Sequence, residues 1–384
     1  MRLKRLQLHD FRSFPTLDLT LNGQVNVFVG GNAEGKTNAL EAVYLLATGR
    51  SHRVAHDREL VRWEAPAYLV RGDFASQAGA VQVEVGFSTE GRKVLRLNGV
   101  AKRRLSDLIG QARVVLFAPE DLELVKGAPE VRRRYIDLQL SQMSAAYYHH
   151  LAAYHRVLDQ RNRLLKVGPQ AEERGLPVWD EKLIVHGVEV IRRRLEAVER
   201  LAGWASDAQR QVSGGQEELS VSYQSSLGGD GQRSSREVPE TDRDPDNLAR
   251  AFRRRLERLR PAEIERGMTL AGPHRDDLRL DINRQEARLF SSQGQQRTAA
   301  LALKLAEVEF MTADGGDPPL LLLDDVLSEL DEKRRGLLLE TVGRVQTIIT
   351  GTDGAPLAGR LAVDVAFYNV TRGTITPAGE GRDR

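Results

Sequence analysis

Eight residues near the N-terminus have the spacing of a phosphate-binding loop. The run GGNAEGKT follows the apolar residues Val25, Val27 and Val29, precedes a helical pattern and fits G-x-x-x-x-G-K-[ST]. Glycines let backbone N–H groups curl around a phosphate, and the following helix N-terminus adds partial positive charge. Lys36 is expected to reach the β- and γ-phosphates of ATP, and Thr37 to offer its hydroxyl to Mg²⁺. The predicted nucleotide-binding residues are Gly30, Gly31, Asn32, Ala33, Glu34, Gly35, Lys36 and Thr37.

Two carboxylates follow an apolar run near the C-terminal end. The run LLLL at 320–323 predicts a buried parallel strand, and the carboxyl ends of such strands are where α/β folds bind their ligands. Asp324 is placed to hold Mg²⁺ through its water shell. Asp325, one residue further on, is the candidate catalytic base that polarises an attacking water.

A second candidate phosphate-binding end lies at SSQGQQR, residues 291–297, directly before a helical pattern. Its candidate residues are Ser292, Gly294 and Gln295. One P-loop cannot use two helix ends on the same γ-phosphate in cis. We therefore expect each copy to offer this end to ATP held by the other, in an isologous, head-to-tail dimer.

Two further patterns are interpreted as structural. SGGQ at 213–216 ends a helical pattern and precedes the alternating ELSVSYQ, so we interpret it as a helix stop and turn. His149, His150 and His155, with Tyr154, and the pair His52/His56 have no carboxylate at an obvious ligand spacing; no metal is expected there.

The surrounding pattern predicts an α/β opening over 1–49, with a helix at about 36–48 that stops at Gly49. A period of two predicts antiparallel strands from about 67 to 117, closed by ARVVLF at 112–117. α/β character returns after 268.

Helical patterns fill most of the middle of the chain, at 130–166, 178–212 and 245–260. The predicted organisation is a composite head from 1–125 and 265–373, a mostly helical insertion at 126–264 with a mobile loop at 226–246, and a flexible tail at 374–384.

Composition excludes several chemistries. The chain has no cysteine, which excludes disulfides, thiolate catalysis and cysteine-ligated metals and suits a reducing cytosol. No signal peptide or membrane span is expected, so the expected location is cytoplasmic. Only nine of the 56 basic residues are lysine, and arginine triplets occur at 132–134, 192–194 and 253–255. Arginine suits phosphate recognition, although codon bias explains the excess equally well.

The ordered motifs resemble those of ABC-type ATPase heads, and within that class the chain is similar to the RecF family, related to SMC and Rad50 heads. The resemblance extends over nearly the whole chain, in FRSF at 11–14, TGRS at 48–51, FAPEDLELVKGAPEVRRRYID at 117–137, LAGPHRDD at 270–277, SSQGQQR at 291–297 and LLLDDVLSELD at 321–331. It implies an α/β ABC-type P-loop ATPase head, with a mixed sheet and an antiparallel β subdomain, plus an inserted helical lobe. It also implies ATP-dependent dimerisation, slow DNA-stimulated ATP hydrolysis and sequence-independent binding to duplex DNA or to single/double-strand junctions. The implied setting is DNA repair, replication restart and the SOS response, where such proteins help RecR and RecO to load RecA at gapped DNA.

The resemblance assigns further roles. Ser292 would be the signature serine, Asp331 would close the D-loop across the dimer, and Arg12 would lie near the nucleotide, although a plain surface arginine is the alternative. Three departures from the ABC pattern point to slow turnover. The base is Asp325 rather than Glu, the switch histidine is replaced by Thr352, and no glutamine occupies the Q-loop, where Glu120 and Asp121 lie instead.

Other classes of protein remain as alternatives. An ABC transporter's ATPase subunit would share the motifs, but it normally carries the switch histidine and lacks the long helical insertion. A long-armed SMC or Rad50 protein would need far longer heptads than 130–260 allows. A small-molecule kinase would not need the SSQGQQR helix end, and a nuclease would need further acidic ligands.

Overall fold

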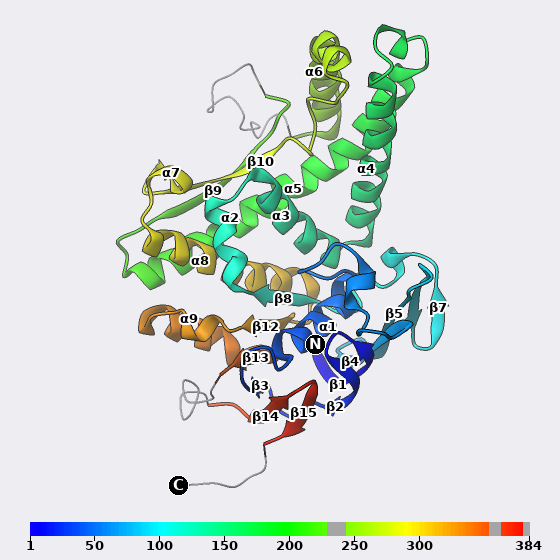
Figure 1. The fold of residues 1–384 in the computed structure, drawn as a ribbon. Coiled ribbons are helices and arrows are strands. Elements are labelled where there is room, and N and C mark those ends of the chain that lie inside the picture. The colour runs from blue at the N-terminus through cyan, green and yellow to red at the C-terminus, as the bar shows by residue number, and fades with distance from the viewer. Residues whose placement is uncertain (229–242, 353–361, 379–384) are drawn as a thin grey trace. The chain divides into compact units, whose positions relative to one another are not determined.

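The computed structural model describes residues 1–228, 243–352 and 362–378, and the chain clusters into two compact units (Figure 1). Unit 1 comprises Met1–Asp121 and Ala300–Arg384, and unit 2 comprises Leu122–Ala299. The second division falls at 299/300 rather than at the predicted 264/265. It falls later because β10 (Asp277–Ile282) pairs along its whole length with β9 (Leu219–Gln224), which makes it part of unit 2.

Unit 1 contains an antiparallel six-stranded sheet. Its order is β2 (Phe14–Thr20), β1 (Arg2–Phe11), β4 (Ala67–Ser76), β5 (Gly79–Ser88), β6 (Lys93–Leu97) and β7 (Val100–Lys102). In β4 the buried side chains alternate, as in Tyr68, Val70 and Phe74, because successive residues of a strand face opposite sides. The segment predicted to close this sheet, β8 (Val114–Phe117), belongs elsewhere: it pairs in parallel with β12 (Leu320–Asp324).

The second six-stranded sheet of unit 1 is mixed. Its order is β15 (Thr374–Pro377), β14 (Val365–Thr371), β3 (Val25–Val29), β13 (Thr347–Gly351), β12 and β8. All four leucines of β12 are fully buried, as expected for an inner parallel strand. The predicted flexible tail begins too early, because β15 pairs with β14; of that tail, residues 379–384 lie outside the described residues.

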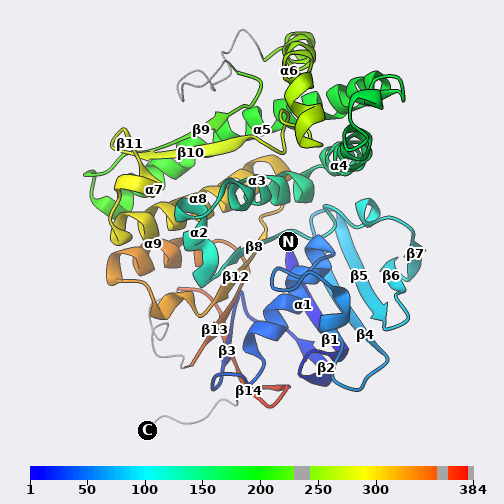
Figure 2. The ribbon, with the colours of Figure 1, turned by 45° about the horizontal axis from the view of Figure 1, so that its top comes forward.

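Helix α1 (Lys36–Thr48) packs against both sheets of unit 1 (Figure 2). It ends as predicted at Gly49, whose φ of 67° is left-handed. Nearly all of its side chains are buried, including the charged Glu41. A helix buried on all sides fixes its own first residue firmly, which is what a binding loop at its N-terminus requires.

Unit 2 is mostly helical. Its principal helices are α3 (Pro129–Met143), α4 (Ala145–Leu165), α5 (Leu176–Ser213) and α6 (Pro245–Arg266). The predicted helix at 130–166 is two helices, because Ser144 is extended and its side chain caps α4 by accepting a hydrogen bond from the Tyr147 backbone N–H. Residues 229–242 of the predicted mobile loop lie outside the described residues.

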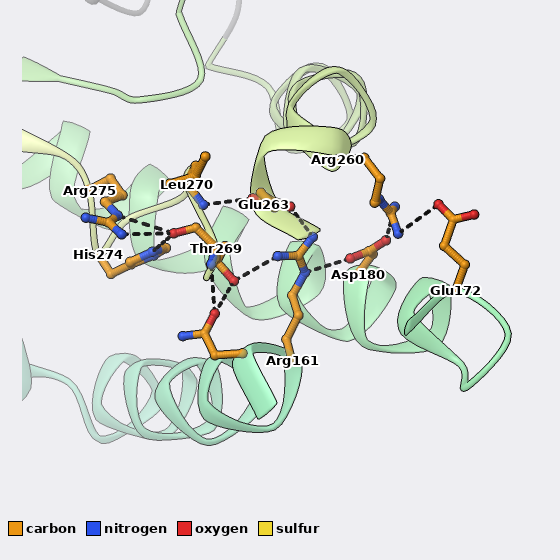
Figure 3. A network of polar contacts seen from close by, with 10 residues as sticks. Arg161, Glu172, Asp180, Arg260, Glu263, Thr269, Leu270, His274 and Arg275 are labelled. Carbon is orange, nitrogen blue, oxygen red and sulfur yellow. Dashed lines mark hydrogen bonds and ion pairs between the residues drawn. The ribbon is translucent and has the colours of Figure 1, made fainter. Parts of the chain in front are cut away.

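A buried arginine joins the helices of unit 2 (Figure 3). Arg161 of α4 donates to Asp180 of α5 at 2.7 Å, to Glu263 of α6 at 2.7 Å and to Thr269 at 2.8 Å. Burial lowers the pKa of the guanidinium, but the two carboxylates outweigh it and raise the pKa above its ordinary value. A charge this buried is tolerated only because it is fully paired, so it specifies how the three helices meet.

One arginine in each of the first two triplets has a structural role. Arg132 makes a paired contact with Asp277 at 2.8 and 2.9 Å, and Arg194 makes one with Asp137 at 2.8 and 2.9 Å. Both guanidiniums are buried, which removes them from the set of candidate DNA contacts. Separately, none of the helices in the described ranges is long and apolar enough to cross a membrane.

Candidate nucleotide site

The predicted P-loop lies between β3 and α1, with the backbone that its glycines allow. Gly35 has φ 111°, and a side chain there would place Cβ 2.7 Å from Ser13 Oγ. At Gly30 a Cβ would lie 2.4 Å from the Val370 carbonyl oxygen. Both positions therefore exclude every residue but glycine. The loop's middle residues, Gly31, Asn32 and Ala33, are exposed.

Two side chains fix the loop. Lys36 is 4% exposed, and its Nζ donates to the carbonyl oxygens of Gly30 at 2.8 Å and Gly31 at 2.9 Å. Its positive charge therefore lies directly against the loop. Glu34 binds the β14–β15 turn, because its side chain accepts from the Arg372 N–H and its carbonyl oxygen accepts from the Gly373 N–H at 3.1 Å.

Thr37 and Asp324 meet, although 287 positions separate them in the sequence. The Thr37 hydroxyl donates to Asp324 Oδ1 at 2.9 Å, and the Thr350 hydroxyl donates to the same oxygen at 2.8 Å. Burial raises the pKa of Asp324; the hydrogen bonds from Thr350 and Thr37 only partly offset it, and Asp325 adds to it. Adjacent hydroxyl and carboxylate oxygens fit Mg²⁺, which prefers oxygen ligands.

Asp325 lies one residue beyond β12 in a left-handed conformation, φ 54°. Its backbone N–H donates to Thr350 Oγ1 at 3.0 Å, so Thr350 contacts both acidic residues. Sequence reasoning missed Thr350. The signal available in the sequence was a threonine within the apolar strand β13. In the sheet, Thr350 lies opposite Asp324. Thr352, the residue at the switch position, is exposed beyond the end of β13.

Arg12 is held in place from α1. Its guanidinium donates to both oxygens of Glu41, at 2.8 and 2.9 Å, and to the Glu59 carbonyl oxygen at 2.9 Å. Ser51 donates to the same carboxylate at 2.5 Å, and Arg53 approaches it to 3.8 Å.

Glu41 itself is fully buried. Burial raises the pKa of its carboxyl, but the Arg12 and Ser51 hydrogen bonds outweigh burial and hold the pKa below its ordinary value. The sequence signal was a lone acid among the apolar residues of a helix, which requires a cationic partner.

Asn38 of α1 connects the Arg12–Glu41–Arg53 cluster to Ser13, which lies beside the P-loop. Arg53 donates to the Asn38 side-chain oxygen at 3.1 Å, and Asn38 donates to Ser13 Oγ at 3.0 Å. Ser13 is the residue whose hydroxyl faces Gly35. Arg12 is therefore more than a surface arginine, because it belongs to a bonded network around the loop.

The Q-loop position holds acids rather than glutamine. Asp121 accepts a hydrogen bond from the Ala118 N–H at 2.8 Å and so closes the 3₁₀ turn Pro119–Leu122. Burial raises the pKa of its carboxyl, and the nearby Lys304 opposes this effect. The geometry of Asp121 is that of a turn cap, and Glu120 is exposed beside it.

The candidate signature lies in unit 2 and begins α8 (Gln293–Gly315). Ser292 Oγ accepts from the Gln295 N–H at 3.2 Å, and the Gln295 side chain accepts from the Ser292 N–H at 2.9 Å. This reciprocal pair is a capping box. Ser292 and Gly294 are exposed at the helix end, so the sequence prediction of a helix N-terminus here is confirmed.

The rejected motif behaves as predicted. Helix α5 ends at Ser213, and both Gly214 and Gly215 are left-handed, with φ of 66° and 81°.

Asp331 caps α9 (Glu332–Val342) by accepting from the Arg334 N–H at 3.0 Å. His150 Nδ1 lies 3.2 Å from Nδ1 of His186, a neighbour that the sequence did not suggest. Within the described residues, no group of three or more His, Asp or Glu side chains has the geometry of a metal site.

Comparison with known proteins defines the class. Residues 2–354 match the family described as the RecF/RecN/SMC N terminal domain. With the P-loop and the mixed sheet of unit 1, this match makes the chain an SMC-like ATPase head. Two curated relatives are named DNA replication and repair protein RecF. The Halalkalibacterium halodurans protein is 43% identical over 382 residues, covering 99% of this chain and 100% of the relative. The Symbiobacterium thermophilum protein is 45% identical over 378 residues, covering 98% of each chain.

A solved structure agrees with the relatives. It is described as the recombination mediator protein RecF with ATP in the RecFOR pathway, and it superposes with a TM-score of 0.87 at 34% identity. The superposition covers 98% of this chain and 97% of the chain in the solved structure. The chain belongs to the RecF family. The transporter subunit is thereby set aside as an alternative, because these relatives match the helical insertion as well as the head.

Proposed function

We propose that the chain is an ATP-dependent DNA-binding protein of DNA replication and recombinational repair. In this proposal it dimerises head-to-tail around ATP and hydrolyses ATP slowly. The observation that carries the proposal is the contact of Thr37 with Asp324, which joins the P-loop helix to the acidic end of β12. The related RecF structure described with ATP supports the same ligand.

The loop residues would bind the triphosphate. Backbone N–H groups of residues 31–35 and the α1 N-terminus would face the phosphates, and Lys36, which now donates to the Gly30 and Gly31 carbonyl oxygens, would supply a point charge. Thr37 and Asp324 would hold Mg²⁺, which when bound neutralises charge on the phosphates. Arg12, fixed by Glu41, would add a second positive group.

Asp325 would position and deprotonate the attacking water. Its backbone N–H donates to Thr350, so its backbone is held by the sheet rather than by a loose loop. An aspartate reaches one methylene less far than a glutamate, and Thr352 adds no charge at the switch position. Both features favour slow turnover, as expected for a switch.

Ser292 would complete the site of a second copy. Its oxygen accepts the Gln295 N–H, which leaves its O–H free to donate to a phosphate. Gly294, exposed in the first turn of the same helix, and Gln295, half-buried beside it, would lie next to that phosphate. Asp331 would close the D-loop across the dimer.

The proposed partners follow from the family. We expect binding to DNA, as duplex or single/double-strand junctions, through phosphate contacts that do not read sequence. RecR is the expected direct partner, with RecO and RecA in the same pathway, and DNA is expected to stimulate the ATPase. The expected location is the cytoplasm.

Size-exclusion chromatography tests the proposal. The protein is run with no nucleotide, with ADP and with a non-hydrolysable ATP analogue, each with and without duplex DNA. A dimer should form only with the ATP analogue. Lys36→Met should abolish that dimer, because the γ-phosphate loses its main point charge. Dimerisation of the Lys36→Met protein with ATP would show that the P-loop assignment is wrong.

A further inference from the structure

Two exposed apolar side chains lie directly before the candidate signature. Helix α7 (Ala287–Phe290) leaves Leu289 57% and Phe290 67% exposed. In the described part of the chain they are the only two large exposed apolar side chains adjacent in sequence. A single exposed apolar residue is ordinary, whereas adjacent exposed apolar side chains form the kind of contiguous patch that marks interaction sites.

Neither side chain is directed into unit 2. A cavity of about 160 Å³ borders α7, and its lining includes Glu286 and Arg288 but neither Leu289 nor Phe290. The buried residue of α7 is Ala287, which is fully enclosed. The helix therefore anchors itself through Ala287 and presents the two larger side chains outward.

Helix α7 and the signature form one piece. The Ser291 N–H donates to the Ala287 carbonyl oxygen at 3.3 Å. The Gln296 side chain, in the first turn of α8, donates to the carbonyl oxygens of Ala287 at 3.4 Å and Ser291 at 3.3 Å. Whatever approaches Ser292 therefore meets α7 in a fixed position.

Chain geometry brings Phe290 close to anything that Ser292 touches. Two residues span at most about 7 Å, so the Cα atoms of Phe290 and Ser292 are no further apart than that. If Ser292 donates a hydrogen bond to a partner's nucleotide, an outward phenylalanine this close must lie in the same interface.

We propose that Leu289 and Phe290 are apolar anchors of the ATP-bound dimer, covered by the nucleotide-binding unit of a second copy of this chain. This inference rests on the proposed function. Phosphate contacts alone bury little apolar surface, whereas stable interfaces contain buried aromatic anchors. In such a dimer, ATP would control when the two copies associate, and α7 would supply much of the affinity between them.

The absence of cysteine makes a direct test simple, because a single introduced cysteine can be labelled cleanly. Phe290→Cys carrying an environment-sensitive dye should shift to the blue when a non-hydrolysable ATP analogue is added, and not with ADP. Val185→Cys, at a 59% exposed position on α5, is the matched control and should not respond. An unchanged Phe290 spectrum in a sample that has dimerised overturns the inference.

Affinity gives an independent test. Phe290→Asp should weaken ATP-dependent dimerisation by about 100-fold, since an isologous interface loses the anchor twice. Phe290→Tyr keeps the ring and should dimerise within about threefold of the parent protein, and an unchanged circular dichroism spectrum and melting temperature of Phe290→Asp would exclude misfolding as the cause. Val185→Asp should have no effect. Monomer ATP binding, measured by titration calorimetry, should stay unchanged in all of these variants.

The outcomes separate the two levels of proposal. Normal dimerisation by Phe290→Asp, with loss in Ser292→Arg, overturns the α7 inference and leaves the proposed dimer intact. Loss of binding to DNA or to RecR by Phe290→Asp, with dimerisation unchanged, overturns it too and assigns α7 to that other partner. If the unmodified protein does not dimerise with ATP, both proposals fall.

Discussion

Thr350 shows how one hydroxyl organises the acidic end of β12. It donates to the side chain of Asp324 and accepts from the backbone of Asp325, so the residue proposed for Mg²⁺ and the residue proposed as base share one support. A catalytic base can only be tested cleanly if its neighbour stays in place. Because Asp325 is held through its backbone, changing its side chain leaves this support intact.

Asp325→Asn should therefore bind ATP and dimerise normally while hydrolysis falls by about 100-fold or more, because only water activation is lost. Single-turnover hydrolysis of radiolabelled ATP, compared with analytical ultracentrifugation of the same sample, measures both. Glu329→Gln, a nearby change that no proposed step involves, is the control. Unchanged turnover in Asp325→Asn would assign the base to another residue.

Glu41→Gln should destabilise unit 1 by about 1–3 kcal/mol, because the half-buried Arg12 loses its ionic partner. ATP affinity should fall with it. Glu59→Gln is the matched control: Arg12 contacts only the backbone carbonyl of Glu59, so this variant should melt like the parent protein.

The pH dependence of Glu41 has a defined sign. Its pKa in the folded protein is held below the ordinary value of 4.5, so its contribution is present above pH 4.5 and disappears as the pH falls through the lowered pKa. The difference in melting temperature between Glu41→Gln and the parent protein should therefore narrow below about pH 4.5. A difference that stays constant down to pH 3 would contradict the ionic role.

Local spacing predicted Lys36, Thr37, Asp324 and the cap at Ser292. It did not predict Thr350 or the pairing of Glu41 with Arg12. The predicted residues lie in loops or at strand ends that a short stretch of sequence encodes. The missed contacts depend on which strand or helix lies alongside, and a single sequence does not specify that.

The two serines that precede glycine-containing motifs differ in the element that they belong to. Ser292 begins α8 with a capping box, whereas Ser213 is the last residue of α5. Only a helix N-terminus presents free N–H groups and a positive dipole end. The element, rather than the letters, decides which serine can meet a phosphate.

Ser292→Arg should leave ATP binding by the monomer unchanged while dimerisation and hydrolysis fail, because a bulky side chain occupies the place of the γ-phosphate. Ser213→Arg should do little. An equimolar mixture of Ser292→Arg and Lys36→Met proteins should recover some hydrolysis, since one hybrid site has both an intact P-loop and an intact serine. The reverse pattern, with collapse only in Ser213→Arg, would make 213–216 the signature.

Element boundaries were predicted best where a single residue marks the end of an element. Gly49 and Gly214 end their helices as expected. The strand β8 was assigned to the wrong sheet, because four apolar residues do not reveal whether their neighbour is antiparallel β7 or the distant, parallel β12. Residues 265–299 were assigned to the wrong unit for the same reason: the β9–β10 pairing is long-range.

The net charge of +2 conceals many ion pairs within the chain. Arg253 is bound to Glu181 at 2.9 and 2.7 Å, and Arg192 contacts Glu189 and Glu196. A phosphate must compete with these carboxylates. Exposed Arg254 is therefore the better candidate for a DNA contact on the third triplet.

DNA affinity should fall steeply with salt, with a slope of log K against log [salt] of about −0.9 per phosphate contacted. Arg254→Gln should weaken binding alike on unrelated sequences and reduce the slope by about 1. Arg210→Gln removes the same charge from α5, where Asp207 and Glu218 already neutralise it, and should change neither quantity. Sequence-selective loss in Arg254→Gln would indicate base readout instead.

Strand β3, which leads into the P-loop, has β13 on one side and β14 on the other. Both neighbours come from the last part of the chain, so a ribosome must release residues up to 371 before β3 is enclosed. At ordinary rates of synthesis, about 20–70 s pass between synthesis of β3 and synthesis of β14. During this time the apolar strand β3 has two unpaired edges, which chaperones would have to protect. The strands and helices of unit 2 lie in one continuous stretch, 122–299, and can all emerge earlier. A translation product that stops before β14 therefore contains the sequence of the phosphate-binding loop but lacks the complete sheet that positions it.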